Sequence, residues 1–381
     1  MENMEKKDAG LPAGKKKRKI PWSMLYILAT VVAVLLFGLF NQQFGNVFHT
    51  ISNLTPGFLS LGVLISLVYF LFEGEIFRLL LRSQGYRISV VEGLKNALLG
   101  LYYSYITPSS TGGQPMQSAY LLRDNKIPAG ISTAVLIVKF MCFQCAFVLV
   151  SVVSFIGMYG NLAANNPTII PFIVLGLVIN GCSILFFASL FYKPVLHLIC
   201  RLAKWLVRKI KFLRKRAGLL ESIDRFEADF SSYTDDFKGK QKSLVAGVLL
   251  SIPQFILQMS VIYFIFRAFG YHNVGYLEIV AVQSLLQVSV SFMPMPGASG
   301  AQEIGFSSFF RNYFVNDDLY AAVMVWRFFT YYLVVIAGAI LVVADQVWYR
   351  KKKLKEALST SEPLDNAQET RYTGPNTQER G

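Results

Sequence analysis

Long apolar runs separated by short polar stretches dominate the chain. Six of these runs reach the roughly 20 residues that an α-helix needs to cross a bilayer, at about 21–40, 54–72, 131–158, 168–192, 243–269 and 319–347. Two further segments, at about 89–126 and 276–314, are apolar but carry Pro and Gly near their middle. The pattern predicts an all-α, polytopic membrane protein with about six full spans and two interrupted or re-entrant helix pairs.

The two interrupted segments repeat each other at a spacing of 188 residues, which also aligns Lys139 with Arg327. Without gaps, this shift superposes identical residues in both segments and in the spans that follow: Pro108 and Pro296, Gly112 and Gly300, Gln114 and Gln302, Arg123 and Arg311, Ala134 and Ala322, Val135 and Val323, Phe140 and Phe328. Three predicted spans separate the copies, and an odd number of crossings inverts the second copy relative to the first. We therefore predict an inverted repeat with halves at about 89–192 and 276–347.

Basic residues gather beside the apolar runs and predict the topology. If each interrupted segment crosses an even number of times, the basic stretches all face the cytoplasm, as the positive-inside rule requires. The predicted parts are a cytoplasmic basic head at 1–19, a membrane domain at 20–347 that includes a cytoplasmic linker at 193–242, and a disordered cytoplasmic tail at 348–381. We expect a multi-pass protein of the cell membrane with both termini in the cytoplasm.

Composition agrees with this class and narrows the chemistry. The chain is 54% hydrophobic and 14% aromatic, more than a soluble domain of 381 residues needs for its core. The four cysteines lie in or beside apolar runs, so neither a disulfide framework nor a zinc site is indicated, and we expect no cofactor. The Lys and Arg residues behind the net charge of +14 lie mainly in short clusters beside the apolar runs, where they determine the topology. Nucleic acid is therefore not the expected partner.

The first interruption, "TPSSTGGQP" at 107–115, predicts an anion site inside the membrane. Gly112 and Gly113 break the helix, and Pro115 suits the first position of a new one. The N-terminus of that helix would direct free amides and a positive dipole end toward the membrane interior. Neutral donors surround it in sequence: Ser109, Ser110, Thr111 and Gln114. The alternative is that these hydroxyls only cap the broken helix.

The second interruption, "MPMPGASGAQE" at 293–303, contributes Gly300, Gln302 and Glu303. Lys139 and Arg327 lie near mid-depth in their spans, where an unpaired charge costs at least ~2.5 kcal/mol. We hypothesise that both bases neutralise a substrate phosphate, with Glu303 engaging either Arg327 or a cationic head group. The alternative is an ion pair that only stabilises the bundle, and no residue is assigned a catalytic role.

Other charged positions are expected at the surface. Glu73, Glu75, Glu92 and Lys95 are predicted to be solvated at the cytoplasmic interface. Residues 219–237 have the spacing of an amphipathic helix that lies on the membrane or under the bundle, and the basic run before it is expected to contact anionic lipid.

The paired motifs "TPSSTGGQPMQSAYLL" and "PMPGASGAQEIGF" resemble those of the lysylphosphatidylglycerol synthase transmembrane, or flippase-like, domain family, over roughly residues 20–347. The resemblance implies translocation of anionic or aminoacylated phospholipid such as phosphatidylglycerol or its lysyl form, and a link to cationic peptide resistance. In members such as the multiple peptide resistance factor, a separate cytosolic domain transfers lysine from lysyl-tRNA to phosphatidylglycerol. Only about thirty polar residues follow Arg350 here, so we expect this chain to lack the synthase domain.

Three functions stay open at this point. The first is a lipid transporter, and the second is the phosphatidylglycerol lysyltransferase that the family name implies. The third is a non-catalytic partner subunit of a separate synthase. In each case phospholipid and the membrane are the expected partners, and a two-fold symmetric homodimer, common among membrane proteins, is one possible oligomeric state.

Overall fold

The computed structural model describes residues 52–210, 218–237, 239–315 and 317–361, and within these ranges it is helical and contains no strand. Five helical stretches are long and apolar enough to cross a membrane: α3 (Pro56–Ser83), α6 (Ala129–Asn165), η2 with α7 (Pro167–Ser189), α11 (Gln241–Ala268) and Asp318–Tyr349. The protein is therefore an all-α polytopic membrane protein, as predicted. The sixth predicted span, at 21–40, and the basic head lie outside the described residues.

Shorter elements connect and interrupt these spans. They are α4 (Val90–Tyr105), η1 (Pro108–Ser110), α5 (Gly113–Asn125), η2 (Pro167–Ile169), α7 (Ile170–Ser189), α8 (Lys193–Lys209), α10 (Leu219–Phe237), α12 (Tyr276–Val290), η3 (Pro296–Ala298), α13 (Ala301–Phe310), α14 (Asp317–Arg327), the π-helical turn η4 (Phe328–Tyr332) and α15 (Leu333–Ser361). The last span is continuous through α14, η4 and α15. Because α15 stays helical as far as Ser361, the tail predicted to be disordered from residue 348 is helical up to that point.

The order of elements occurs twice. Each copy has a long helix, a half-helix, a short turn, a second half-helix and another long helix, in α3–α6 and again in α11–α15. The second half-helices begin at Gly113 and Ala301, and the long helices that follow begin at Ala129 and Asp317, so both pairs keep the spacing of 188 residues. The repeat therefore begins with α3 and α11, before the predicted boundaries at 89 and 276.

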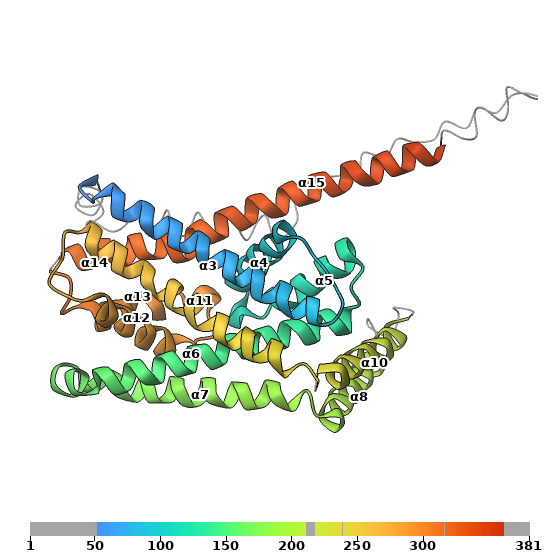
Figure 1. Ribbon diagram of the computed structural model, residues 1–381, viewed down its shortest axis with the longest axis horizontal. Coiled ribbons are helices and arrows are strands. Elements are labelled where there is room, and N and C mark those ends of the chain that lie inside the picture. Colours follow the sequence, from blue (N-terminus) through green and yellow to red (C-terminus); the bar gives the residue numbers. More distant parts are fainter. Residues whose placement is uncertain (1–51, 211–217, 238, 316, 362–381) are drawn as a thin grey trace, which may run out of the picture. The chain divides into compact units, whose positions relative to one another are not determined.

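Equivalent helices of the two copies run in opposite directions. Helices α3 and α11 pack side by side along their length (Figure 1). The Thr55 N–H, at the start of α3, donates to the Ala268 carbonyl at the end of α11 over 3.1 Å. The other contacts between the copies follow the same pattern. Helix α12 of the second copy packs on α6 of the first, and α4 of the first copy packs on α15 of the second. The copies are thus inverted relative to one another, the construction found in many secondary transporters.

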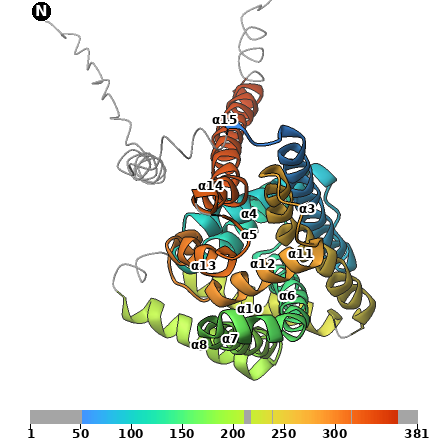
Figure 2. The same ribbon diagram turned by 90° about the vertical axis from the view of Figure 1, so that its left-hand side faces the viewer.

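The two hairpins enter the bundle from opposite ends. The hairpin of α4 and α5 begins beside the end of α3, where Arg78 Nε donates to the Ile88 carbonyl over 3.1 Å. The hairpin of α12 and α13 begins beside the end of α11, and Figure 2 shows α12 near the middle, with α11 and α6 on one side and α13 on the other. Their turns, η1 and η3, contact each other. Each hairpin therefore turns back inside the bundle instead of crossing it.

Helices α8 and α10 lie together at the end of the bundle where α3 ends (Figure 1). Phe230 and Tyr233 of α10 are buried against the start of α6, so the predicted amphipathic helix packs under the bundle. In α8, a second apolar set is exposed: Leu198, Ile199, Leu202, Trp205 and Leu206. This face and the neighbouring basic side chains suit the predicted contact with an anionic membrane surface.

Close packing of α4 on α5 depends on Gly113. A Cβ at this position would overlap Ser104 Oγ and lie 2.6 Å from the Gly100 carbonyl oxygen, and backbone cannot give way as a flexible side chain can. We expect Gly113→Ala to destabilise the fold by about 1–3 kcal/mol, as overpacking does. Thermal unfolding in detergent measures the effect. Gly160→Ala is the matched control, since a Cβ there meets nothing within 4 Å. Equal unfolding of the two variants would contradict the close approach.

Candidate functional site

The turns at the two hairpin tips have the same unusual backbone. Residues 109 and 110 have φ of 52° and 54°, and the equivalent residues 297 and 298 have φ of 56° and 49°. Three of these four residues, Ser109, Ser110 and Ala298, are not glycine, although left-handed backbone is unfavourable for them. The Ser109 N–H donates to the Pro294 carbonyl over 3.2 Å, which joins the tips directly. Strained backbone of this kind concentrates at functional sites.

The hydroxyls of the first tip divide into two groups. Thr107 Oγ1 accepts from the Gly112 N–H at 2.9 Å, and Thr111 Oγ1 donates to the Pro108 carbonyl at 3.0 Å, so these two threonines cap the turn. Ser109 and Ser110 are exposed, and their hydroxyls make no hydrogen bond within the part of the chain that the structure describes. The capping alternative therefore holds for Thr111, while the two serines are open to a ligand.

The start of α5 differs slightly from its predicted form. The helix begins at Gly113, so Pro115 is its third residue and not its first. Proline is still accommodated, because the first turn of a helix has no internal partner for its N–H groups. Gly112 occupies the N-cap position without a side-chain cap, and Gln114, the second residue of the helix, is half-buried.

The second tip holds a charged pair. Arg327 Nε donates to Glu303 Oε1 at 2.7 Å, and the other guanidinium nitrogens donate to the Gly297 carbonyl at 3.3 Å and to Ser299 Oγ at 3.0 Å. The Gly300 N–H donates to the remaining carboxylate oxygen at 2.6 Å. The Arg327 side chain is 6% exposed and that of Glu303 is 35% exposed. The pair is thus anchored on the turn, and its acid is the more exposed member.

Two tyrosines that the sequence analysis did not single out link the tips. The rings of Tyr105 and Tyr331 lie 5.3 Å apart, and Tyr331 OH donates to the Tyr105 carbonyl at 3.4 Å. The Arg327 guanidinium lies over the Tyr331 ring at 4.7 Å from its centroid. In an apolar run such tyrosines resemble ordinary core residues, so only the folded tips reveal their position.

Lys139 belongs to a different cluster. Its ammonium pairs with Glu73 of α3, and Gln254 of α11 donates to the same carboxylate. All three side chains are buried. No hydrogen bond or ion pair joins Lys139 to the tips among the described residues. The expectation that Glu73 is solvated was therefore wrong. An acid directly after the apolar run 54–72 was the available signal, because a buried lysine needs a partner.

The side chain of Gln302 contacts the other helix of its own hairpin. It is buried, and its Nε2 donates to Gln287 Oε1 of α12 at 3.2 Å, which holds the second hairpin together. Gly300 serves as the N-cap of α13 with φ of 85°, a backbone conformation that favours glycine. Of the predicted site residues, the structure thus brings together Ser109, Ser110, Gly300, Glu303 and Arg327.

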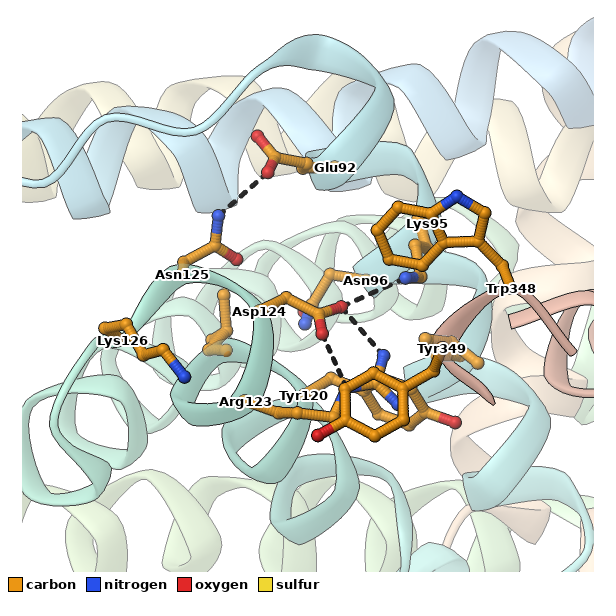
Figure 3. Close-up of a pocket in the computed structure, with 12 residues that line it drawn as sticks. Glu92, Lys95, Asn96, Tyr120, Arg123, Asp124, Asn125, Lys126, Trp348 and Tyr349 are labelled. Atoms are coloured by element: carbon orange, nitrogen blue, oxygen red, sulfur yellow. Dashed lines mark hydrogen bonds and ion pairs between the residues drawn. The ribbon is translucent and has the colours of Figure 1, made fainter. Parts of the chain in front are cut away.

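A cavity of about 530 Å³ lies elsewhere, between the beginning of α4, the end of α5 and α15 (Figure 3). Its lining combines both charges with aromatic rings: Glu92, Lys95, Asn96, Leu99, Tyr120, Leu121, Arg123, Asp124, Asn125, Lys126, Trp348 and Tyr349. Lys95 pairs with Asp124 at 3.0 Å and also with Asp345 of α15, which is nearly inaccessible. Arg123 pairs with the same two acids. Lys95 and Glu92 thus line a cavity, whereas the sequence analysis predicted that they are simply solvated.

Asp124 makes this network sensitive to acid. Burial alone would raise the Asp124 pKa, but hydrogen bonds from Arg123 and Lys95 outweigh burial and lower the pKa. Stabilisation by a group with a depressed folded-state pKa is complete above its unfolded value of about 3.9, and it disappears as pH falls through the folded value. We expect the unfolding temperature in detergent to fall with acid below about pH 4. Asp124→Asn should show a smaller slope, and an equal slope would contradict the assignment.

Metal ligands are not grouped in the described ranges, where no set of three or more His, Cys, Asp or Glu side chains could hold an ion. The tips themselves offer charges and hydroxyls. They present one arginine, one partly exposed carboxylate and several neutral hydroxyls.

Comparison with known proteins places the chain among membrane proteins. A family model described as the lysylphosphatidylglycerol synthase TM region matches residues 26–338. A UPF0104 membrane protein of Archaeoglobus fulgidus is 29% identical over 286 residues, which cover 70% of this chain and 79% of the relative. A UPF0104 membrane protein of Methanothermobacter thermautotrophicus is 24% identical over 294 residues, which cover 74% and 80%.

Proposed function

The chain belongs to the family of lysylphosphatidylglycerol synthase transmembrane regions, and from this membership and its inverted repeat we propose that it moves phospholipid between membrane leaflets. The proposed cargo is anionic or aminoacylated phospholipid, such as phosphatidylglycerol or its lysyl form. We place the protein in the cell membrane with both termini cytoplasmic. A change in outer-leaflet charge would connect it to cationic peptide resistance, as the family likeness suggests.

The observation that carries the proposal is the meeting of the two hairpin tips. Irregular backbone is tolerated at membrane depth only where protein or a watery cavity satisfies its polar groups. Here two such turns enter from opposite ends and are joined by the hydrogen bond from Ser109 to Pro294. A site built this way is accessible in turn from either side if one copy rocks against the other, as in transporters with inverted repeats.

The Glu303–Arg327 pair supplies the proposed recognition step. A phosphate that reaches the tips takes the place of Glu303 on Arg327, so the buried guanidinium stays neutralised throughout. Leaving it unpaired would cost at least ~2.5 kcal/mol. Ser299 Oγ already accepts a hydrogen bond from the Arg327 guanidinium, and the open hydroxyls of Ser109 and Ser110 would add neutral hydrogen bonds to the phosphate oxygens.

Displacement of Glu303 would free a carboxylate. Its side chain is 35% exposed and keeps the hydrogen bond from the Gly300 N–H, so it remains in place when Arg327 is taken by phosphate. An ammonium on the head group is the natural new partner for this acid. Aminoacylated lipid would thus satisfy both members of the pair, whereas phosphatidylglycerol would satisfy only Arg327.

Reconstitution tests this function. The purified chain in liposomes that carry head-group-labelled phosphatidylglycerol, or its lysyl form, should make inner-leaflet label accessible outside faster than empty liposomes do. Exchange should be selective for these head groups. A rate equal to that of empty liposomes, with both lipids and with or without an ion gradient, would reject transport.

Two other assays then separate the remaining functions. Lysylated lipid formed in a host without its own synthase would favour the lysyltransferase. Co-purification of a synthase that depends on residues 193–242 would favour the partner-subunit function.

A further inference from the structure

The cavity between α4, α5 and α15 is separate from the hairpin tips. None of the tip residues lines it, and its acids and bases come from the beginning of α4 and the end of α5, while α15 contributes Trp348 and Tyr349. Asp345, which lies just behind the lining, ties α15 to both hairpin helices through Lys95 and Arg123. The cavity is therefore formed by three elements that ion pairs hold together.

Its charges balance. Three bases, Lys95, Arg123 and Lys126, face three acids, Glu92, Asp124 and the adjacent Asp345. Lys95 and Arg123 are already neutralised by the acids that they share. An anionic ligand on Lys95 or Arg123 would have to displace a carboxylate that these bases already hold and leave it without a partner, which is unfavourable. A ligand with both charges avoids that cost.

Two lining charges have no ion-pair partner within the described ranges. Lys126 makes no salt bridge there, and Glu92 is held by hydrogen bonds from the Ser89 N–H at 2.7 Å and from Asn125 Nδ2 at 2.9 Å. The Ser89 backbone hydrogen bond lowers the Glu92 pKa, so the side chain stays anionic at neutral pH. Figure 3 shows Glu92 and Lys126 on either side of Asn125. This pair of opposite charges sets the polarity of a ligand.

Aromatic side chains indicate the depth in the bilayer at which that ligand would bind. Trp348 and Tyr349 line the cavity, and these residue types concentrate at the head-group level of a bilayer. The Arg123 guanidinium lies over the rings of Tyr120 and Tyr349, at 4.5 and 4.9 Å from their centroids. Because a cation already covers one face of each ring, these two tyrosines are poorly placed to bind a quaternary ammonium.

We propose that this cavity binds a head group that carries both a phosphodiester and a primary ammonium, with the phosphate on Lys126 and the ammonium on Glu92. Glu92 and Asn125 offer oxygen acceptors to the N–H groups of the ammonium. The source is either an ethanolamine phospholipid of the adjacent leaflet or a soluble phosphodiester of the same chemistry. Binding here goes beyond the proposed transport, because it requires no movement of lipid.

Native mass spectrometry of the full chain in detergent measures the affinities directly. With matched acyl chains, phosphatidylethanolamine should bind about tenfold tighter than phosphatidylglycerol, which lacks the ammonium, and than phosphatidylcholine, which lacks its N–H donors. Calorimetry with free glycerophosphoethanolamine distinguishes the source. Weak binding of the free compound assigns the lipid, and binding as tight as that of the lipid assigns the soluble ligand.

Two variants test the polarity without disturbing the fold. Glu92→Gln keeps the capping hydrogen bonds, since glutamine also serves at this helix position, but removes the acid. Lys126→Asn keeps a residue that accepts left-handed backbone, which Lys126 adopts with φ of 58°. Each should weaken phosphatidylethanolamine binding about tenfold, and Glu92→Gln alone should abolish the preference over phosphatidylglycerol. Arg225→Gln, an exposed charge loss on α10, is the control.

Equal binding of the three lipids, or unchanged binding in both variants, would overturn the proposal. Neither result depends on transport. Loss of exchange in an Arg327 variant with unchanged phosphatidylethanolamine binding would leave this site intact, and the reverse pattern would leave the transport proposal intact.

Discussion

Replacing Arg327 with glutamine is expected to slow lipid exchange by about a hundredfold while the protein still folds. The guanidinium makes charge-assisted hydrogen bonds to Glu303, Gly297 and Ser299, and removal of such contacts from a site costs about 3 kcal/mol. The acid left behind is 35% exposed and keeps the Gly300 N–H, so the folded state is affected much less than recognition is. Exchange of head-group-labelled lipid in liposomes measures the loss.

Two further variants separate charge from geometry. Arg327→Lys keeps the charge but loses the planar fork that reaches the turn and Glu303 together, so we expect it to recover only part of the rate. Arg311→Gln removes the same residue type from an exposed position of the same copy and should exchange lipid normally. Full activity in Arg327→Gln would show that the pair at the tip only stabilises the fold, and loss of activity in Arg311→Gln would point to a general effect of charge.

The repeat explains how much of this site was accessible from the sequence. The ungapped shift that aligned Pro108 with Pro296 also aligned the residues with left-handed backbone, and the turns duly share their φ values. Local rules for Pro and Gly thus located both tips. The pairing of Glu303 with Arg327 was one of two stated alternatives, and the structure joins the two residues at 2.7 Å.

Contacts between distant segments were harder to predict. Glu73 lies 66 residues from Lys139, and its apolar neighbours gave no indication of which helix it faces. Asp345, which ties α15 to the helices of the cavity, is 250 residues from Lys95. Such partners depend on how α3, α6 and α15 pack, and a spacing rule for a single helix carries no information on that.

Removing one member of the Lys139–Glu73 pair is expected to destabilise the fold strongly. In Lys139→Gln the Glu73 carboxylate stays buried and keeps only the hydrogen bond from Gln254, and an uncompensated buried charge costs about 3–5 kcal/mol. Glu73→Gln should have a similar effect, because it leaves the ammonium unpaired. The free energy of unfolding in detergent, measured by denaturant titration, reports the change.

The double variant decides what the pair is for. Glu73→Gln with Lys139→Gln removes both charges and leaves amides that hydrogen-bond each other and Gln254, so most of the lost stability should return. If lipid exchange returns with it, the pair is structural, and the hypothesis that Lys139 binds phosphate is wrong. If stability returns and exchange does not, Lys139 or Glu73 acts in transport.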